Sequence, residues 1–507
     1  MGWLSVFDET ARGIGSALRR SVNEQVLAIE QDLFTARSGY HALLQALYDN
    51  TIYEDAAVWQ AYKARFRLPR SIRAIYNPTR RAVDWYPGHV YPGPWTNDGR
   101  PLPDGTLPAL PFAPDMLADR PQLVAAALQA LAWGNWAATR HVYVREGAKF
   151  GSVLAVVTDN LERRKVYPEI VPLRYLRELV LDASGNVKAY ALEYQIVDET
   201  TRRAVTYRRK VDRERIVEQR GNQIVTEIAN PYGFVPAAWV RHRHTGGLFG
   251  APVIDGVISK IDELNALATA IHNYVHRWHN QPMIFLGTQG QPRIAGKAGA
   301  TDDDVAVADI ESVRWLWDPS PNGKVQPLLS DIGIGQAGTY LTQLLEEIEA
   351  DLPEIVMDEQ LRSMSQVTGP GAAQMMSDVA AKLWEAQANY DAGLVKLMQM
   401  SAAIGGWRLS RGDWGPRSQL TAQQLAFAGF DLTSYARNEL EIELMPRPLV
   451  PATPAERLGQ WALEKDVLGL SDAEMRRRAG IDPELSAQID QELVAEGERR
   501  VAAGAFA

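Results

Sequence analysis

Two stretches with helical spacing, residues 252–279 and 333–352, flank an insert of short predicted strands, and this arrangement constrains the fold more than any other feature. The first stretch carries apolar residues at heptad spacing, namely Ile254, Val257, Ile261, Leu264, Ala268, Ile271 and Val275. A stripe of this kind predicts a helix with one apolar side, about 40 Å long at 1.5 Å per residue. No catalytic signature accompanies it.

The second stretch is also one-sided. Its apolar residues fall on one helical face and its acidic residues fill the others; the apolar set is Leu341, Leu344, Leu345, Ile348 and Leu352, and the acidic set is Glu346, Glu347, Glu349 and Asp351. We therefore expect two amphipathic helices joined by the strand-rich insert at residues 281–330.

Composition narrows the class of protein. A chain of 507 residues with 46% hydrophobic content can bury large cores, and its length favours two to four domains. Neither a long apolar run nor a charged-then-apolar leader is visible, so we expect no membrane span and no secretory signal. The absence of cysteine excludes disulfides and thiolate metal sites and fits an intracellular origin.

Charge argues against a protein that grips nucleic acid. The formal net charge is −9 and the pI is about 5.6, whereas nucleic-acid-binding domains are usually basic. Basic residues nevertheless crowd one short stretch: Arg202, Arg203, Arg208, Arg209, Lys210, Arg213, Arg215 and Arg220. We interpret this run as a solvated hairpin.

The first part of the chain reads as helices followed by a loop. Apolar spacing predicts helices within residues 1–70. Residues 86–114 are rich in proline and glycine and predict an extended surface loop, because proline removes a hydrogen-bond donor and fixes φ. A helix is expected near residues 121–138.

Period-two alternation then predicts a sheet across residues 141–243. The expected strands are residues 179–181, 189–197, 204–211 and 216–228, and Asn230-Pro231-Tyr232-Gly233 ends the sheet. In the insert, strands are expected at residues 283–286, 304–308 and 313–317.

Beyond residue 352 the chain is predicted to be helical again. A polar loop at residues 361–371 precedes a long helix over residues 372–404. Short amphipathic helices follow from residue 451, one of them opening on the capping box Ser471 to Glu474.

Three motifs offer alternative readings. Residues 333–338 match the dinucleotide-binding spacing, with Asp358 downstream, and would support a nucleotide-dependent oxidoreductase; the preceding Gln326-Pro327 and the helical downstream sequence argue against it. Residues 290–297 fail the phosphate-loop spacing. His272 and His276 share a helix face and could hold an interface metal, although Asn273 stands where a metalloprotease needs its glutamate.

The order of these parts resembles the portal protein of tailed double-stranded DNA bacteriophages. The resemblance rests on residues 71–78, on Asn230 to Pro236 leading into residues 247–260, on Thr368-Gly369 before the long helix, and on the tail at residues 468–498. It covers most of the chain. It implies an α+β, mainly helical subunit with an α+β wing, a two-helix stem, a small α/β clip and a helical C-terminal crown, assembled into a ring.

The resemblance also implies domain boundaries. They are an N-terminal helical segment at residues 1–35, wing at 36–251, first stem helix at 252–280, clip at 281–330, second stem helix at 331–357, tunnel loop at 358–371, wing long helix and return at 372–447, and crown at 448–507.

The function implied is that of a non-enzymatic DNA conduit in the virion. The subunits of such a protein form a homo-oligomeric ring, commonly dodecameric, at one capsid vertex, through which double-stranded DNA is packaged and ejected. The implied partners are the terminase large subunit, the head-tail adaptor, and the major capsid and scaffolding proteins. The resemblance implies no cofactor, no metal and no membrane. It places the protein in the virion, at the capsid portal vertex, and in the host cytoplasm before assembly.

Two sets of residues would meet the DNA in that interpretation. The tunnel loop would present Gln366, Val367, Thr368, Gly369 and Gly371. Because each basic contact to phosphate would add a barrier to movement, a conduit should be acidic or neutral. We therefore expect the acidic set of residues 333–352 to include channel-facing residues. A structural scaffold without DNA contact is the remaining alternative.

Overall fold

The computed structural model divides the chain into two compact units. Unit 1 comprises residues 1–45, 80–253 and 354–507, and unit 2 comprises residues 46–79 and 254–353. The structure describes residues 37–54, 75–102, 106–197, 202–279, 283–286, 316–318, 325–327, 334–356, 377–447, 459, 462–463, 465–467, 469, 471–478 and 483–504. Helices and largely antiparallel sheets make this an α+β protein, as predicted.

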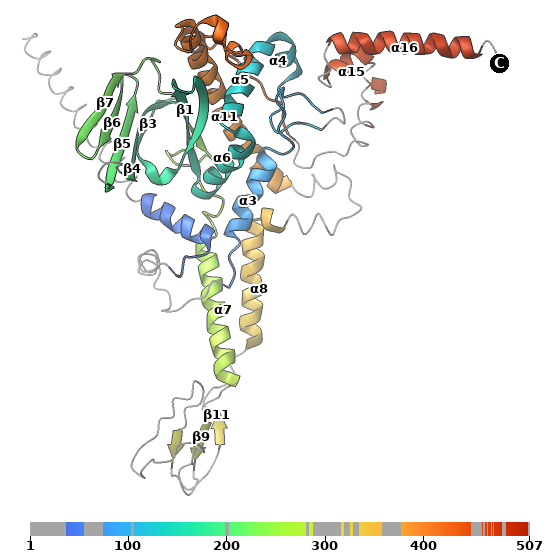
Figure 1. Ribbon diagram of the computed structural model, residues 1–507. Helices are drawn as coiled ribbons and strands as arrows, with labels where there is room; N and C mark the ends of the chain where they lie inside the picture. Colours follow the sequence, from blue (N-terminus) through green and yellow to red (C-terminus); the bar gives the residue numbers. More distant parts are fainter. Residues whose placement is uncertain are drawn as a thin grey trace, which may run out of the picture. The chain divides into compact units, whose positions relative to one another are not determined.

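A long helix and a three-stranded sheet form the centre of unit 1 (Figure 1). Helices α5 (Pro121–Trp133), α6 (Trp136–Phe150) and α11 (Ser377–Ser410) pack on the sheet of order β2-β1-β8, whose strands are β2 (Lys165–Val171), β1 (Ser152–Asn160) and β8 (Ala237–Arg241). Tyr390, Leu394 and Leu397 of α11 are fully buried. The Tyr390 hydroxyl donates to the Val144 carbonyl, 3.1 Å away, which fixes α11 against α6.

The sequence around residue 141 was misread as strand. Helix α5 begins at Pro121, whose fixed φ suits a first helical position, and ends before Gly134. Asn135 has φ 52° and separates α5 from α6, which continues to Phe150. Tyr143, Val144, Gly147 and Ala148 are its buried face, so the Val142/Val144 alternation belonged to a helix.

A five-stranded antiparallel sheet of order β3-β4-β5-β6-β7 forms the other layer of strands in unit 1. Its strands are β3 (Leu176–Leu181), β4 (Val187–Val197), β5 (Ala204–Asp212), β6 (Arg215–Arg220) and β7 (Gln223–Ala229). The single strand predicted over residues 216–228 is wrong, because Gly221, at φ 59°, starts a two-residue turn that folds β6 and β7 into a hairpin.

The proline-rich segment at residues 86–114 is not simply a surface loop. Helix α3 (Thr79–Val90) runs through Pro87 into it, and helix α4 (Pro114–Asp119) begins at its end. Leu110 and Phe112 are at most 2% exposed, and Phe112 forms an antiparallel bridge with Leu444. This part of the chain therefore belongs to the core of unit 1.

Unit 2 contains α7 (Ile258–His279), α8 (Ile334–Asp351) and a small sheet. The expected start of the first helix at residue 252 is wrong, since residues 253–257 form turns before Ile258. The small sheet has the order β10-β9-β11, with β9 (Met283–Leu286), β10 (Leu316–Asp318) and β11 (Val325–Pro327). Strand β11 was not predicted. The strand expected at residues 304–308 lies outside the described residues.

Shorter elements complete the described chain. Residues 37–49 are helical, as expected for that region. Helix α11 ends six residues later than predicted. The helices that follow it are α12 (Ala422–Leu425), α13 (Leu432–Ala436), α15 (Asp472–Arg478) and α16 (Pro483–Gly504). Two short 3-10 turns are η1 (Leu173–Tyr175), before β3, and η2 (Arg417–Gln419), after α11. Helix α15 starts directly after Ser471, where the capping motif placed a helix start. Among the described helices, none is long and apolar enough to cross a membrane.

Candidate functional site: the paired helices and their acidic face

Helices α7 and α8 pack on each other along their apolar stripes. Ile261 and Leu264 of α7, and Leu344 and Ile348 of α8, are each no more than 5% exposed. Removing such a side chain from water contributes about 1.5–3 kcal/mol, so apolar contact holds the pair together. The one-sided character predicted for both helices is confirmed over this span.

Two of the acids on α8 face α7. Lys260 Nζ lies 2.9 Å from Asp351 Oδ2 and 3.2 Å from Glu347 Oε2. The hydrogen bond to Asp351 is the main cause that raises the pKa of Lys260. On the same side of α8, the Tyr340 hydroxyl donates to Glu263 Oε1 at 2.7 Å. These polar contacts border the apolar seam, and because they are exposed to solvent they contribute little stability.

The other two acids point away from α7. At 3.6 residues per turn, Glu346 and Glu349 lie about 160° and about 100° around the helix from the buried Ile348. Both are exposed, and within the described part of the chain neither carboxylate has an ion-pair partner. Thr339 and Thr342 lie on the same side, with each hydroxyl bonded to the carbonyl four residues earlier. We call Thr339, Thr342, Glu346 and Glu349 the outward face of α8.

A buried asparagine ties an early segment of the chain to α7. Asn265 is 1% exposed. Its Oδ1 accepts the main-chain N–H groups of Ile75 and Tyr76 at 2.9 and 2.8 Å, and its Nδ2 donates to the Tyr76 carbonyl at 2.8 Å. One turn away, the Tyr53 hydroxyl donates to Asp262 Oδ1 at 2.6 Å. Burial and the nearby Asp262 carboxylate raise the pKa of Tyr53.

The same segment continues into a helix cap. Asn77 Oδ1 accepts the N–H of Thr79, the first residue of α3, at 3.1 Å, while its Nδ2 donates to the Leu47 carbonyl at 2.7 Å. The Asn77-Pro78 pair, one of the features behind the portal resemblance, therefore has a structural role here. Sequence reasoning missed Asn265 and Asp262, although with Thr269 they form a polar stripe at helical spacing, and all three are buried.

A buried carboxylate follows α8 and lies in unit 1. Glu354 is 2% exposed, and neither of its oxygens has a hydrogen-bond partner among the described residues. Lys382 Nζ of α11 lies 3.5 Å from Glu354 Oε2. Burial raises the pKa of Glu354 and the Lys382 charge opposes that rise. This residue was also missed, because a single glutamate after Pro353 gives no signal in the sequence.

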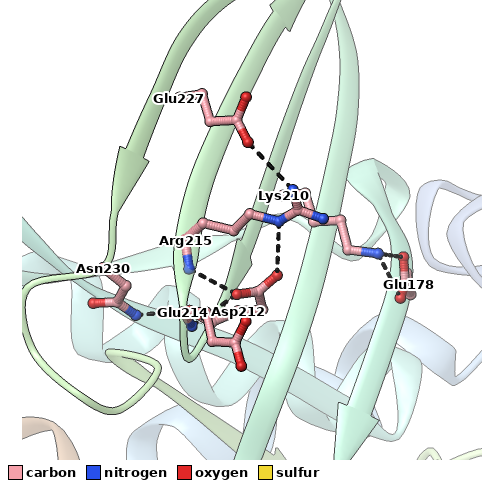
Figure 2. A network of polar contacts seen from close by, with 7 residues as sticks. All are labelled: Glu178, Lys210, Asp212, Glu214, Arg215, Glu227 and Asn230. Carbon is pink, nitrogen blue, oxygen red and sulfur yellow. Dashed lines mark hydrogen bonds and ion pairs between the residues drawn. The ribbon is translucent and has the colours of Figure 1, made fainter.

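The basic run begins just before β5, with Arg202 and Arg203, and continues over β5, the following turn and β6. Acids of the same sheet pair with four of its members. Figure 2 shows Lys210 paired with Glu178, and Arg215 placed between Glu227 and Asp212. Asn230 adds a hydrogen bond from its Nδ2 to the Asp212 carbonyl, 2.7 Å away. Two further pairs are Arg208 with Glu193 and Arg209 with Glu218. The interpretation of this run as a solvated hairpin is confirmed.

The alternative motifs fare differently. Gly335 and Gly338 lie inside the first turns of α8, and the preceding strand β11 pairs antiparallel with β9, whereas a pyrophosphate site requires a parallel strand-to-helix turn. His242 is buried, with its Nδ1 3.1 Å from the Tyr390 hydroxyl, which makes it a core residue. His272 is exposed. No cluster of metal-ligating side chains occurs in the described residues.

Several sequence predictions fall outside the described residues. The tunnel-loop set of Gln366, Val367, Thr368, Gly369 and Gly371 is among them, as are residues 290–297, Asp358 and the side chain of His276. Those predictions stay predictions.

The structural neighbours described below are weak. No protein-family model matches the chain, and no curated protein matches it. A chain in the virion of a native gene transfer agent particle is 13% identical, with TM-score 0.38, and the alignment covers 80% of this chain and 90% of that one. A chain from the neck of the native particle, computed with C12 symmetry, gives 13% identity and TM-score 0.37, with coverage of 80% and 90%. A chain from the neck of the empty particle, computed with C6 symmetry, is 12% identical with TM-score 0.38, and the alignment covers 80% of this chain and 91% of that one. These TM-scores are too low to establish a shared fold.

Proposed function

We propose that this chain is the subunit of a phage portal, a ring at a capsid vertex through which double-stranded DNA is packaged and ejected. In this proposal unit 1 supplies the wing, α7 and α8 form the stem, and the small sheet of β9, β10 and β11 belongs to the clip. Residues 46–54 and 75–79 would then go with the stem rather than the wing; the hydrogen bonds of Asn265 to the main chain of Ile75 and Tyr76 support this.

The observation that carries the proposal is the division of polar groups on α8. Its apolar stripe and one acidic edge are used to pair with α7, while the outward face offers Glu346 and Glu349 to solvent. An acidic wall repels phosphate and lets DNA pass without being held, since bound phosphates would release counterions and add affinity at each step. Ion pairs to four members of the basic run, Arg208, Arg209, Lys210 and Arg215, weaken the main candidate for a DNA-gripping surface.

Further parts of the proposal follow from the resemblance. The partners would be the terminase large subunit at the clip, the head-tail adaptor after packaging, and the major capsid and scaffolding proteins around the wing. The motor would supply ATP hydrolysis, so this chain needs neither a catalytic site nor a cofactor.

The first experiment is electron microscopy of the purified chain and of particles that contain it. Rings with a bore wide enough for a duplex are expected. Compact single molecules under every assembly condition, capsids included, would refute the proposal, and rings with no open bore would favour a scaffold without DNA contact.

The second experiment tests the outward face. The double variant Glu346→Lys/Glu349→Lys should assemble rings but package less DNase-protected DNA, because lysines at the wall would bind passing phosphates. The matched control is Glu162→Lys/Asp119→Lys, which makes the same charge change at exposed acids of unit 1. Equal amounts of packaged DNA in the two variants would show that the outward face of α8 does not line the channel.

A further inference from the structure

A cavity of about 530 Å³ lies within unit 1 where its two sheets approach each other. Residues 237–239 of β8 line one side, and the β3–β4 turn at Asp182 to Asn186 lines another. Lys396 of α11 and Tyr435 of α13 close it. The volume is within the range that small ligands or peptide segments occupy in proteins.

The cavity runs along the free edge of β8. Strand β8 is an edge strand of its sheet. The hydrogen bonds from Val157 N to Pro236 O and from His242 N to Gly151 O show which residues of this strand turn their main-chain groups towards β1. In an antiparallel pair, alternate residues turn their main-chain groups away from the partner, which here places Trp239 outward.

Two observations show that this edge is available. Within the described part of the chain, the main-chain N–H and C=O of Trp239 have no partner. Three consecutive β8 residues line the cavity; because side chains alternate between the faces of a strand, a cavity against one face would meet only every second residue. The open space therefore adjoins the hydrogen-bonding edge.

At the inner wall of the cavity the acceptors of Asp182 are in use, whereas Lys396 has donors left over among the described residues. The Asp182 carboxylate accepts the main-chain N–H groups of Ser184 and Asn186 and the Asn186 side-chain amide, and these bonds lower its pKa. Among the described residues, Lys396 Nζ donates to Asn186 Oδ1 alone, at 2.8 Å, although an ammonium has three N–H donors. Burial lowers the pKa of Lys396 and the Asp182 charge opposes that fall; an incoming carboxylate would compensate the remaining cost.

The other charged groups are either already bonded or exposed at the rim. Asp212 Oδ1 already accepts the main-chain N–H groups of Glu214 and Arg215. The Glu214 side chain is exposed at the rim, beside the exposed Lys188 and Arg213. The inner wall therefore presents one partly buried ammonium with unused donors next to an unpaired strand edge.

We propose that this cavity binds an extended segment of a protein partner, which pairs as a strand with the main chain of Trp239 and places a carboxylate against Lys396. Main-chain pairing would supply affinity, and the carboxylate would supply selectivity, as in other cases of strand addition to an open sheet edge. The proposal does not rest on ring formation.

The test uses a synthetic library of random seven-residue peptides selected on the full-length protein, with dissociation constants of the enriched peptides measured by fluorescence anisotropy. Peptides that carry aspartate, glutamate or a free C-terminal carboxylate between alternating apolar residues should be enriched. Amidation of the C-terminus then shows which carboxylate is used. Acetate at millimolar concentration should not displace them, because it cannot pair with the strand edge.

Matched variants and peptides separate the two contacts. Lys396→Met should weaken binding roughly tenfold or more, as expected for a lost hydrogen bond to a charged group, while Lys396→Arg should restore much of it. Lys165→Met, which makes the same change outside the cavity, should leave binding unchanged. Methylation of one central peptide nitrogen should also weaken binding to the wild-type protein.

The outcomes that overturn the proposal are equally defined. Failure to enrich any acidic peptide, equal affinity for wild-type and Lys396→Met proteins, or indifference to peptide N-methylation would each do so. Circular dichroism checks the fold of Lys396→Met, and if that variant is misfolded the N-methylation measurement on wild-type protein decides alone.

Discussion

Replacing Asn265 by leucine should open the contact between α7 and residues 75–76 without changing side-chain volume greatly. The substitution leaves two main-chain N–H groups and one main-chain carbonyl without their partner in a site where Asn265 is 1% exposed. At about 1 kcal/mol for each lost hydrogen bond, the local free energy of opening should fall by about 3 kcal/mol. That corresponds to roughly 100-fold faster amide hydrogen exchange.

The assay is hydrogen exchange with mass spectrometry on peptic fragments that contain Ile75 and Tyr76. Those fragments should lose protection in Asn265→Leu, while fragments of α11 in unit 1 should not change. Ser259→Ala, at an exposed position of α7, is the control on the same helix. Unchanged exchange at residues 75–76 would show that Asn265 does not hold this segment.

Three other substitutions test unit 1. Burial lowers the pKa of His242 from 6.5 to about 3, so between these pH values the unfolded chain binds a proton that the folded chain excludes. The free energy of unfolding of wild type, relative to His242→Gln, should therefore fall by about 1.4 kcal/mol per pH unit as the pH drops from 6.5 towards 3. A difference in urea unfolding that does not depend on pH would contradict this. Arg447→Met should lower the free energy of unfolding by about 3–5 kcal/mol, because Arg447 is 2% exposed and donates to both Asp391 carboxylate oxygens. Adding Asp391→Leu should recover part of this loss. Thermal unfolding that shows no recovery would argue against a buried pair. Gly393→Ala should lower the free energy of unfolding, again measured by thermal unfolding, by about 1–3 kcal/mol, since a Cβ there would clash with Val240. An unchanged melting temperature would show that α11 can shift to make room.

Local patterns predicted the elements whose signals lie within one segment. The apolar spacing of α8 gave nearly its observed bounds, Ile334–Asp351, and period-two alternation located β3, β4 and β5. Errors occurred where a short-range cue was ambiguous. Val142 and Val144 fit both a strand and the helix α6, and the turn at Gly221 was hidden within a continuous β-prone run.

The candidate site was predictable only in part. Composition and helical spacing pointed to the four acids of α8, but they could not separate Glu346 and Glu349 from Glu347 and Asp351. That division depends on Lys260, which is far away in the sequence and lies beside only two of them.

The sequence by itself determined the amphipathic character of α7 and α8, the acidic balance and the α+β composition, because these properties depend on residue type and on spacing along one segment. Tertiary structure alone decided which polar groups form hydrogen bonds or ion pairs within the protein and which are left to bind something else. Asn265, Arg208 and Arg209 take their partners from other segments. Within the described part of the chain, the main chain of Trp239 stays unpaired because its strand lies at the edge of a sheet. Hydrogen bonds and ion pairs form between groups that folding brings together, so their satisfaction is a property of the fold and not of any local pattern.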